Sequence, residues 1–174
     1  MDIATNPNMD SHDQFSTLLQ QHRKILLKVA RTYAWHADDR ADLGQEIAAQ
    51  LWRAYPHYDP QRTFSTWMYR IALNVAISWV RSNSRRQQHN LAFDDALHDV
   101  ADDVASPESV HQVRELRRFI ASLEPLNRAL LLLYLEEHSY REIADIVGIS
   151  ESNVATKISR LKQRVRDELT GNHA

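Results

Sequence analysis

The sequence contains no cysteine and only three glycines among its 174 residues. Without cysteine the chain can form no disulfide bond and can offer no thiolate ligand to a metal. The nine histidines are scattered without a close pair at metal-binding spacing, so we expect no metal site and no cofactor. Scarce glycine together with frequent Ala, Leu, Arg and Glu favours helices. The composition therefore predicts an all-α protein, and its 43% hydrophobic residues are enough for real cores.

Long apolar runs are also absent. The longest extends from Ala129 to Leu135, far short of the roughly 20 residues that span a bilayer, and its position far from the N-terminus excludes a signal peptide. Residues 1–14 begin with a polar stretch, and we expect them to form a disordered tail. No nucleophile–base pair, glycine-rich phosphate loop or metal cluster is recognisable. The sequence predicts a cytoplasmic protein that is not an enzyme.

Charge is unevenly distributed along the chain, although the formal net charge is only −2. Residues 61–90 contain five arginines and no carboxylate, whereas residues 91–109 contain six acidic residues and no lysine or arginine. The acidic stretch has poor periodicity, which is typical of a flexible linker. We therefore predict two small helical domains, residues 15–88 and 108–174, joined by a flexible acidic linker over residues 89–107.

The segment from Ser139 to Leu169 predicts two helices joined by a tight turn. Ser139 can cap the first helix, and Glu142 three residues later completes a capping box. Gly148 is the residue type most able to adopt the left-handed conformation that ends a helix. Ser150 is a good N-cap for the second helix. This pattern is typical of a helix-turn-helix.

The second of these helices has an apolar side and a polar side. We expect the apolar side to be buried, and it carries Val154, Ile158, Leu161, Val165 and Leu169. Five basic residues and no acidic one lie between Lys157 and Arg166, so its C-terminal half can meet phosphates while its N-terminal half reads base edges. The alternative is a plain two-helix hairpin with a solvated face. The candidate contacts to duplex DNA are Ser152, Asn153, Thr156, Lys157, Ser159, Arg160 and Arg164.

A second polar stripe is predicted on the helix that begins at Phe64. Its core-facing residues would be Phe64, Met68, Ile71, Ala72, Val75 and Trp79. Single-stranded nucleic acid needs cations for its backbone and flat rings or amides for its bases. The opposite stripe offers such groups, although its arginines could also simply reach water, and Trp67 at its edge fits the core and a base contact equally well. The stripe consists of Thr66 and the candidate single-strand contacts Arg70, Asn74, Ser78, Arg81 and Arg85.

The remaining apolar patterns predict four more helices. The spacing over residues 15–33 fits one amphipathic helix, and Asp38 and Asp39 can begin a second. That second helix would bury Leu43, Ile47, Leu51 and Ala54 and expose Asp42, Gln45, Glu46, Ala49 and Arg53. Ser106 and Pro107 form a good helix start. The helix that follows would bury Val110, Val113, Leu116, Phe119, Ile120 and Leu123, and a further helix from Pro125 would carry the apolar run at the centre of the second core.

Three segments resemble bacterial sigma factors of the extracytoplasmic-function (ECF) type in the sigma-70 family. They are DLGQEIAAQLWRAY (Asp42 to Tyr55), FSTWMYRIALN (Phe64 to Asn74) and LEPLNRALLLLYLEEHSYREIADIVGIS (Leu123 to Ser150), followed by the second helix of the turn motif. The first two are specific, whereas response-regulator output domains share much of the third. The resemblance covers about residues 15–86 and 108–170.

The resemblance implies a sigma factor that binds core RNA polymerase and directs promoter recognition and strand opening. Residues 15–86 would be region 2, which docks on the polymerase and opens the −10 element, and residues 108–170 would be region 4, which reads the −35 element. An anti-sigma factor would be a further partner. By position, the polymerase-docking residues would be Asp42, Gln45, Glu46 and Arg53. Ala155 departs from the family pattern, since many relatives carry a basic residue there.

Two other classes of protein fit parts of the sequence. An autonomous helix-turn-helix regulator would need a ligand pocket or a dimer interface with symmetric half-sites, and the N-terminal half shows neither. A helical interaction module that does not bind DNA would have no need of the acid-free run over residues 61–90. Core-polymerase binding and promoter-dependent transcription distinguish the three classes.

Overall fold

The computed structural model describes residues 7–87 and 107–171, with side chains described over 11–83 and 111–168. These ranges contain eight α-helices, one short 3-10 helix (η1) and no β-strand, so the predicted all-α class is confirmed. The elements are α1 Pro7–Gln21, α2 Arg23–Tyr33, α3 Ala37–Ala54, η1 Tyr55–His57, α4 Phe64–Gln87, α5 Pro107–Ser122, α6 Pro125–Leu135, α7 Tyr140–Val147 and α8 Glu151–Gly171. Except for Pro107, the predicted acidic linker lies outside the described residues.

The N-terminal segment differs from its prediction in two ways. The expected single helix over residues 15–33 is broken at His22, whose φ of −104° and ψ of 12° separate α1 from α2. The His22 ring lies 5.1 Å from that of Phe64, so the break is fixed by a contact with α4 that no local pattern reveals. The predicted tail is also wrong for residues 7–14, because α1 begins at Pro7 and the His12 ring packs 5.3 Å from the Trp52 ring of α3.

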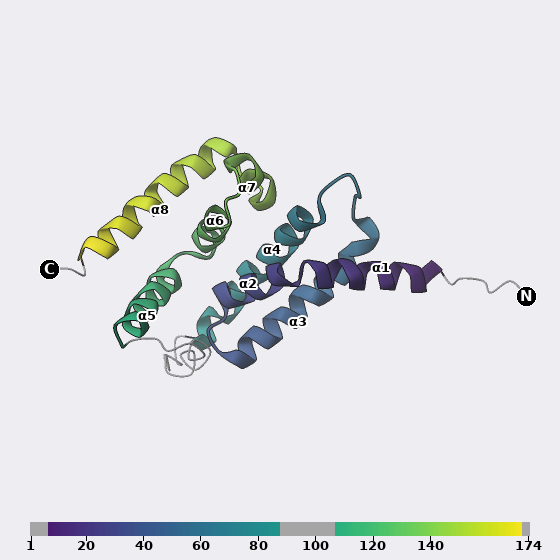
Figure 1. Ribbon diagram of the computed structural model, residues 1–174, viewed down its shortest axis with the longest axis horizontal. Coiled ribbons are helices and arrows are strands. Elements are labelled where there is room, and N and C mark those ends of the chain that lie inside the picture. Colours follow the sequence, from purple (N-terminus) through teal and green to yellow (C-terminus); the bar gives the residue numbers. More distant parts are fainter. Residues whose placement is uncertain (1–6, 88–106, 172–174) are drawn as a thin grey trace, which may run out of the picture.

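The first half of the chain folds around α2, α3 and α4, which pack against one another (Figure 1). Leu43, Ile47 and Leu51 of α3 are fully buried as predicted, while Ala54 is half-buried. Phe15 reaches this core from α1. The loop that leads into α4 is held by Tyr58, whose hydroxyl donates to the carbonyl of Arg62 over 2.6 Å. This contact fixes the direction in which α4 begins.

The second half is built on α6, α7 and α8, with α5 packed less closely. Leu130 and Leu133 of α6 are buried, which confirms a central role for this helix. Two apolar residues predicted to be buried are wrong: Leu116 is 55% exposed and Leu135 is 67% exposed. Leu135 is the last residue of α6, where the chain turns away from the core, and among the described residues nothing covers the Leu116 face of α5.

The predicted turn chemistry of the helix-turn-helix is confirmed in detail. The Ser139 and Glu142 side chains form a full capping box at the start of α7. Gly148 ends this helix with a φ of 80°, in the left-handed region that glycine enters at no steric cost. The backbone N–H of Asn153 donates to Ser150 Oγ over 3.2 Å, so Ser150 caps α8. Ile143 and Ile146 form the buried side of α7, with exposed fractions of 0% and 2%.

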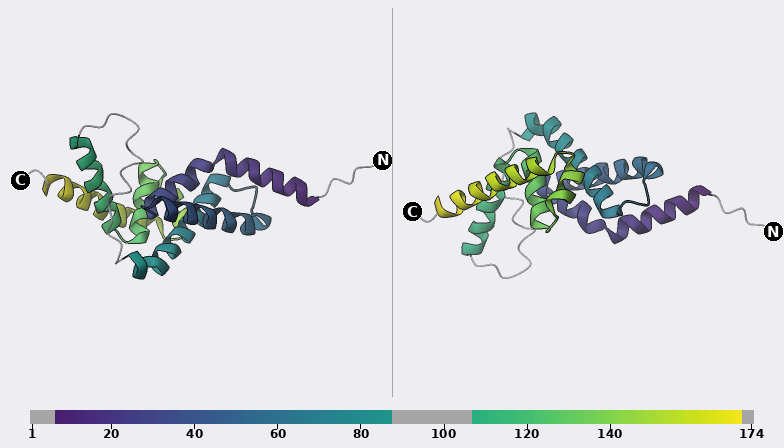
Figure 2. Two further views of the ribbon diagram at one scale, coloured as in Figure 1. Left: turned by 90° about the horizontal axis from the view of Figure 1, so that it is seen from below. Right: turned by 90° about the horizontal axis from the view of Figure 1, so that it is seen from above.

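The two halves are docked on each other, with the turn between α6 and α7 seated against α2 and α4 (Figure 2). That turn is a Schellman motif: the N–H of Glu137 bonds to the Tyr134 carbonyl and that of His138 to the Leu133 carbonyl, both over 3.1 Å. Glu137 takes the left-handed position with a φ of 62°, where glycine is more usual. The motif places His138 with its ring 5.2 Å from that of Tyr69 on α4.

The predicted core face of α4 is wrong in part, because the second half of the chain also packs against this helix. Phe64, Met68 and Ala72 are buried as expected, but Ile71, Val75 and Trp79 are only half-buried. The structure instead buries a second set of residues, namely Tyr69, Leu73, Ala76 and Val80. The cause is that α2 and α3 cover one side of α4 while α6 and α7 cover another, so a single apolar stripe underestimates the buried arc.

We predict that Gly148→Ala lowers the free energy of unfolding by about 1 kcal/mol, since an L side chain is strained at this φ. No heavy atom lies within 4 Å of a Cβ placed there, so the loss would come from the backbone alone. Gly148→Asn is the matched control, because asparagine tolerates the left-handed region better. Urea unfolding of the three proteins measures both losses, and equal losses for Ala and Asn would contradict this account.

Candidate nucleic-acid interface

The polar side of α8 faces solvent over its whole described length. Val154, Ile158 and Leu161 are buried against α6 and α7, which fixes the rotation of the helix. Of the candidate duplex contacts, Lys157 is half-buried and the others are exposed: Ser152, Asn153, Thr156, Ser159, Arg160 and Arg164. The structure therefore brings all seven predicted residues onto one accessible face of one helix, which is the shape that fits a major groove.

Some of these side chains already have partners within the protein. The Thr156 hydroxyl donates to the Ser152 carbonyl one turn earlier, over 3.0 Å. The Arg164 guanidinium lies 5.9 Å from the centre of the Phe119 ring, so it also braces α5 against α8. Lys162, which points to a different side, lies 4.5 Å from the Tyr134 ring. Of the basic residues of α8, Lys157 and Arg160 lie nearest the N-terminal half of the helix, among the other polar candidates.

On α4 the predicted stripe is exposed where its side chains are described. Arg70, Asn74, Ser78 and Arg81 are all exposed, while the Arg85 side chain lies outside the described residues. Thr66 is half-buried, and its hydroxyl accepts a hydrogen bond from Thr63 over 2.8 Å. The stripe therefore exists as a surface, with its guanidinium and amide groups directed away from the first core.

The N-terminal part of this stripe borders a cleft of about 620 Å³. It is lined by Arg62, Thr63, Thr66, Trp67, Arg70, Ile71, Asn74 and Asp145. The walls thus provide two guanidiniums, two hydroxyls, one amide and one indole, which are the groups that bind the backbone and bases of a single strand. Of the five predicted single-strand contacts, the cleft brings together only Arg70 and Asn74. Ser78 and Arg81 lie further along α4.

Trp67 packs against the core and also borders the cleft, so both positions that the sequence left open apply to it. Its ring lies 5.0 Å from Tyr58, 5.2 Å from Phe64 and 6.4 Å from Tyr55, in a cluster of aromatic rings at the start of α4. The residue is only half-buried, and it also lines the cleft. Ring contacts hold the indole in place, so its accessible part is a fixed wall rather than a mobile one.

The predicted docking residues on α3 lie on a separate face. Asp42, Gln45, Glu46 and Arg53 are exposed, opposite the buried Leu43, Ile47 and Leu51. Glu46 accepts a hydrogen bond from Gln50 over 2.8 Å and lies 4.0 Å from the Arg53 guanidinium. These contacts link residues one or two turns apart on α3 and leave the face as a whole open to a partner.

Three residues of the cleft, Arg62, Thr63 and Asp145, were not found by sequence reasoning, and Ile71 was predicted to face the core. Arg62 lies in the acid-free run over residues 61–90, and that run is the sequence signal that could have identified it as a candidate contact. Asp145 comes from α7, more than 70 residues further along the chain, and no sequence signal connects it with α4. Within residues 7–87 and 107–171, no group of three His, Asp or Glu side chains could hold a metal ion, and no helix has the length and apolar character to cross a membrane.

Comparison with protein families gives two matches. A model described as "Sigma-70 region 2" matches residues 18–86, and one described as "Sigma-70, region 4" matches residues 113–165. Together the two models cover more than half of the chain. The first contains α2, α3 and all of α4 except its last residue, and the second contains α6, α7 and most of α8.

Curated proteins and solved structures give consistent similarities. The chain is 30% identical over 173 residues to "ECF RNA polymerase sigma factor SigE" of Mycolicibacterium smegmatis, covering 97% of this chain and 64% of that protein. It is 32% identical over 133 residues to "Probable RNA polymerase sigma factor RfaY" of Xanthomonas campestris, covering 74% and 33%. It thus spans less than two thirds of either relative. The Bartonella quintana sigma factor RpoE, solved with the anti-sigma factor NepR, shares the fold with a TM-score of 0.69 at 20% identity, over 90% of this chain and 97% of that one.

We predict that two substitutions in the cleft differ strongly in their effect on stability. Asn74→Ala removes an exposed side chain and should change the free energy of unfolding by less than about 0.5 kcal/mol. Trp67→Ala removes the ring contacts with Tyr58 and Phe64 and should cost roughly 2 kcal/mol or more. Thermal melting followed by circular dichroism compares the two. A large loss for Asn74→Ala would mean that the amide supports the fold rather than facing a ligand.

Proposed function

The chain belongs to the ECF branch of the sigma-70 family of RNA polymerase sigma factors, and from that premise we propose that it binds core RNA polymerase and directs promoter recognition, strand opening and transcription initiation. The observation that carries the proposal is the presence of two different nucleic-acid faces in one chain. The exposed side of α8 fits duplex DNA, and the cleft at the start of α4 fits a single strand. A regulator that binds only duplex DNA would need the first face and not the second.

The α8 face would read the −35 element as duplex. Its short polar side chains near the N-terminus suit base edges in the major groove, and Lys157 and Arg160 suit the adjacent phosphates. Ala155, which is half-buried and uncharged, would make no phosphate contact of its own. We place promoter reading on the seven residues of this face and assign no chemical step to the chain, since the reaction belongs to the polymerase.

The α4 cleft would hold one strand of the opened −10 element. Unstacking a base from a duplex costs a few kcal/mol, and a pocket that receives the unstacked base recovers part of this cost. Asn74 offers an amide that can both donate to and accept from a base edge. Arg62 and Arg70 would neutralise the flanking phosphates, and the fixed indole of Trp67 would provide a stacking surface.

The outer face of α3 would dock on the polymerase through Asp42, Gln45, Glu46 and Arg53. Because bacterial transcription takes place in the cytoplasm, we place the protein there. An anti-sigma factor is a further proposed partner, supported by the Bartonella quintana sigma factor RpoE, which shares the fold and was solved in complex with the anti-sigma factor NepR.

The docked arrangement of the two halves is incompatible with simultaneous use of both promoter elements. Elements centred near −35 and −10 lie roughly 80 Å apart along a duplex with about 3.4 Å per base pair. In the structure α7, which leads directly into α8, contacts α4. The halves must therefore separate before the α8 face and the α4 cleft can occupy the two elements of one promoter.

Run-off transcription from a cognate promoter with core polymerase tests the proposed function directly. We predict that the Gln45→Ala and Glu46→Lys double variant loses polymerase binding while its melting temperature stays unchanged, because both side chains are exposed. Pull-down of polymerase subunits measures the loss. A matched control is Glu115→Lys, an acidic-to-basic change on α5 outside the proposed docking face. Equal binding by the docking variant and the parent would refute the assignment of α3.

The two nucleic-acid faces are predicted to fail at different steps. Asn74→Ala should reduce strand opening, measured by permanganate reactivity near the start site, with little effect on closed-complex formation. Lys157→Ala and Arg160→Ala should instead weaken initial binding, and loss of a phosphate contact should also lower the salt dependence of that binding. An Asn74→Ala protein that melts normally and opens promoters as well as the parent would end the single-strand assignment.

A further inference from the structure

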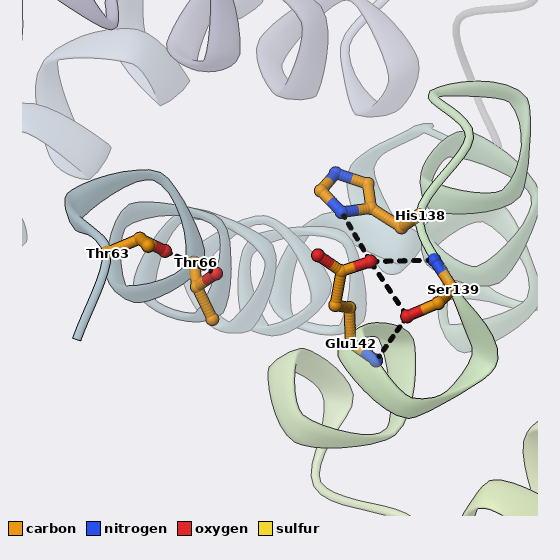
Figure 3. A network of polar contacts seen from close by, with 5 residues as sticks. All are labelled: Thr63, Thr66, His138, Ser139 and Glu142. Atoms are coloured by element: carbon orange, nitrogen blue, oxygen red, sulfur yellow. Dashed lines mark hydrogen bonds and ion pairs between the residues drawn. The ribbon is translucent and has the colours of Figure 1, made fainter.

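Helix α7 presents two carboxylates toward the α4 cleft. Asp145 lines the cleft itself, together with Arg70 and Asn74 of α4 and Arg62 of the preceding loop. Glu142 is three residues earlier, so it lies on the same side of the helix. Figure 3 shows the first turns of α4 and α7 facing each other, with one Glu142 carboxylate oxygen on the side of Thr63 and Thr66. Negative charge from region 4 therefore stands beside the surface proposed to receive a DNA strand.

The position of Glu142 is fixed by its capping box. Its Oε2 accepts hydrogen bonds from the Ser139 backbone N–H and from the Ser139 hydroxyl, both over 2.8 Å. These two bonds lower the pKa of the Glu142 carboxyl, so it stays charged near neutral pH. Asp145 is exposed, and within the described residues no ion pair joins it to Arg62 or Arg70. Its charge therefore acts across the cleft without being locked to one cation.

We propose that α7 is a built-in inhibitor of strand capture: with the two halves docked, the carboxylates of Asp145 and Glu142 repel the phosphates of a single strand from the α4 cleft, and undocking removes this barrier. The inference rests on the proposed function of the cleft and adds its regulation. A strand carries one negative charge per nucleotide, so a carboxylate in the wall acts against the guanidiniums that should attract it.

Three contacts hold α6 and the turn before α7 against the first half, and through them they fix the position of α7. The Lys28 ammonium of α2 pairs with the Glu136 carboxylate after α6. The Tyr33 hydroxyl donates to the Pro125 carbonyl over 2.7 Å, and the rings of Tyr69 and His138 meet edge to face. Burial, with a smaller effect of the Glu136 charge, raises the pKa of Tyr69 to about 12, so this ring stays neutral in the interface. We call these three contacts the latch.

Asp145→Asn is the direct test of the inhibitor. Glu142 is unsuitable because its replacement also removes the α7 cap, whereas Asp145 is exposed near the C-terminal end of α7, where a negative charge does not stabilise a helix. The full-length protein is titrated against an end-labelled single-stranded oligonucleotide of random sequence at low salt, followed by fluorescence anisotropy. Asp145→Asn should bind about two- to fivefold more tightly, a gain of the size expected for one partly screened charge, and added salt should reduce it.

Two control variants make this result specific. Glu168→Gln removes the same charge from an exposed position on α8 and should bind like the parent. Adding Arg70→Ala to Asp145→Asn should cancel the gain, because the cleft then keeps only the Arg62 guanidinium to attract the strand. An equal gain in Glu168→Gln, or a gain that persists without Arg70, would show a general charge effect and overturn the proposal. Absence of measurable binding by Asp145→Asn would overturn it as well.

Charge exchange tests the latch independently of net charge. Lys28→Glu and Glu136→Lys each break the same ion pair but change the net charge of the protein in opposite directions. Both single variants should bind the oligonucleotide more tightly than the parent, and the double variant, which restores the pair, should return to parental affinity. Opposite effects of the two single variants would show that only net charge matters and would contradict the latch.

The proposed function can fail separately from this inference. If run-off transcription with core polymerase succeeds and Asp145→Asn binds single strands no better than the parent, the chain is a sigma factor without this inhibitor. If Asp145→Asn binds more tightly and Arg70→Ala cancels the gain, the electrostatic effect stands even where no promoter is transcribed. Circular dichroism melting of every variant excludes unfolding as the cause.

Discussion

The arrangement of the whole chain depends on the burial of α4 from two directions. Met68, Ala72, Leu73 and Ala76 of α4 are all buried, and this helix packs against α2 and α3 as well as against α6 and α7. A helix that serves two cores cannot present a wide polar face, so its polar groups are restricted to a narrow stripe. That restriction places the Arg70 guanidinium and the Asn74 amide of α4 together at the edge of one cleft, and Asp145 of α7 lines the same cleft.

The features that could be predicted from the sequence are those whose causes lie within a few residues. The Ser139 cap, the left-handed Gly148 and the Ser150 cap each depend on hydrogen bonds or backbone angles that span at most four residues. The break at His22 and the wider burial of α4 could not be predicted, because their causes are tertiary. His22 meets a ring more than 40 residues away, and α4 meets helices that follow a connection of unrelated composition.

The residues of the candidate site also separate into those that local patterns predict and those that tertiary contacts bring in. Arg70 and Asn74 were predicted because they recur at helical spacing within one acid-free run, and the α8 face was predicted for the same reason. A periodic pattern assigns residues to a face but cannot say where that face is hollowed. The hollow at the start of α4 is set by the loop that Tyr58 braces and by the approach of α7. For this reason Arg62 and Asp145 join the site only in three dimensions, while Ser78 and Arg81 fall outside the cleft.

The chemistry of the interface between the halves suits a contact that must open. Beside the apolar residues of α4 that α6 and α7 cover, the interface contains an ion pair with side chains 43% and 30% exposed, a tyrosine–carbonyl hydrogen bond and an edge-to-face ring pair. The polar and aromatic contacts contribute on the order of 0.5–1.5 kcal/mol each, so contacts with a partner can replace them. A ligand can shift such an equilibrium only by its differential affinity for the open state. Polymerase and promoter DNA, each engaging a different half, would supply that difference, since a shift from mostly docked to mostly open needs about 5 kcal/mol.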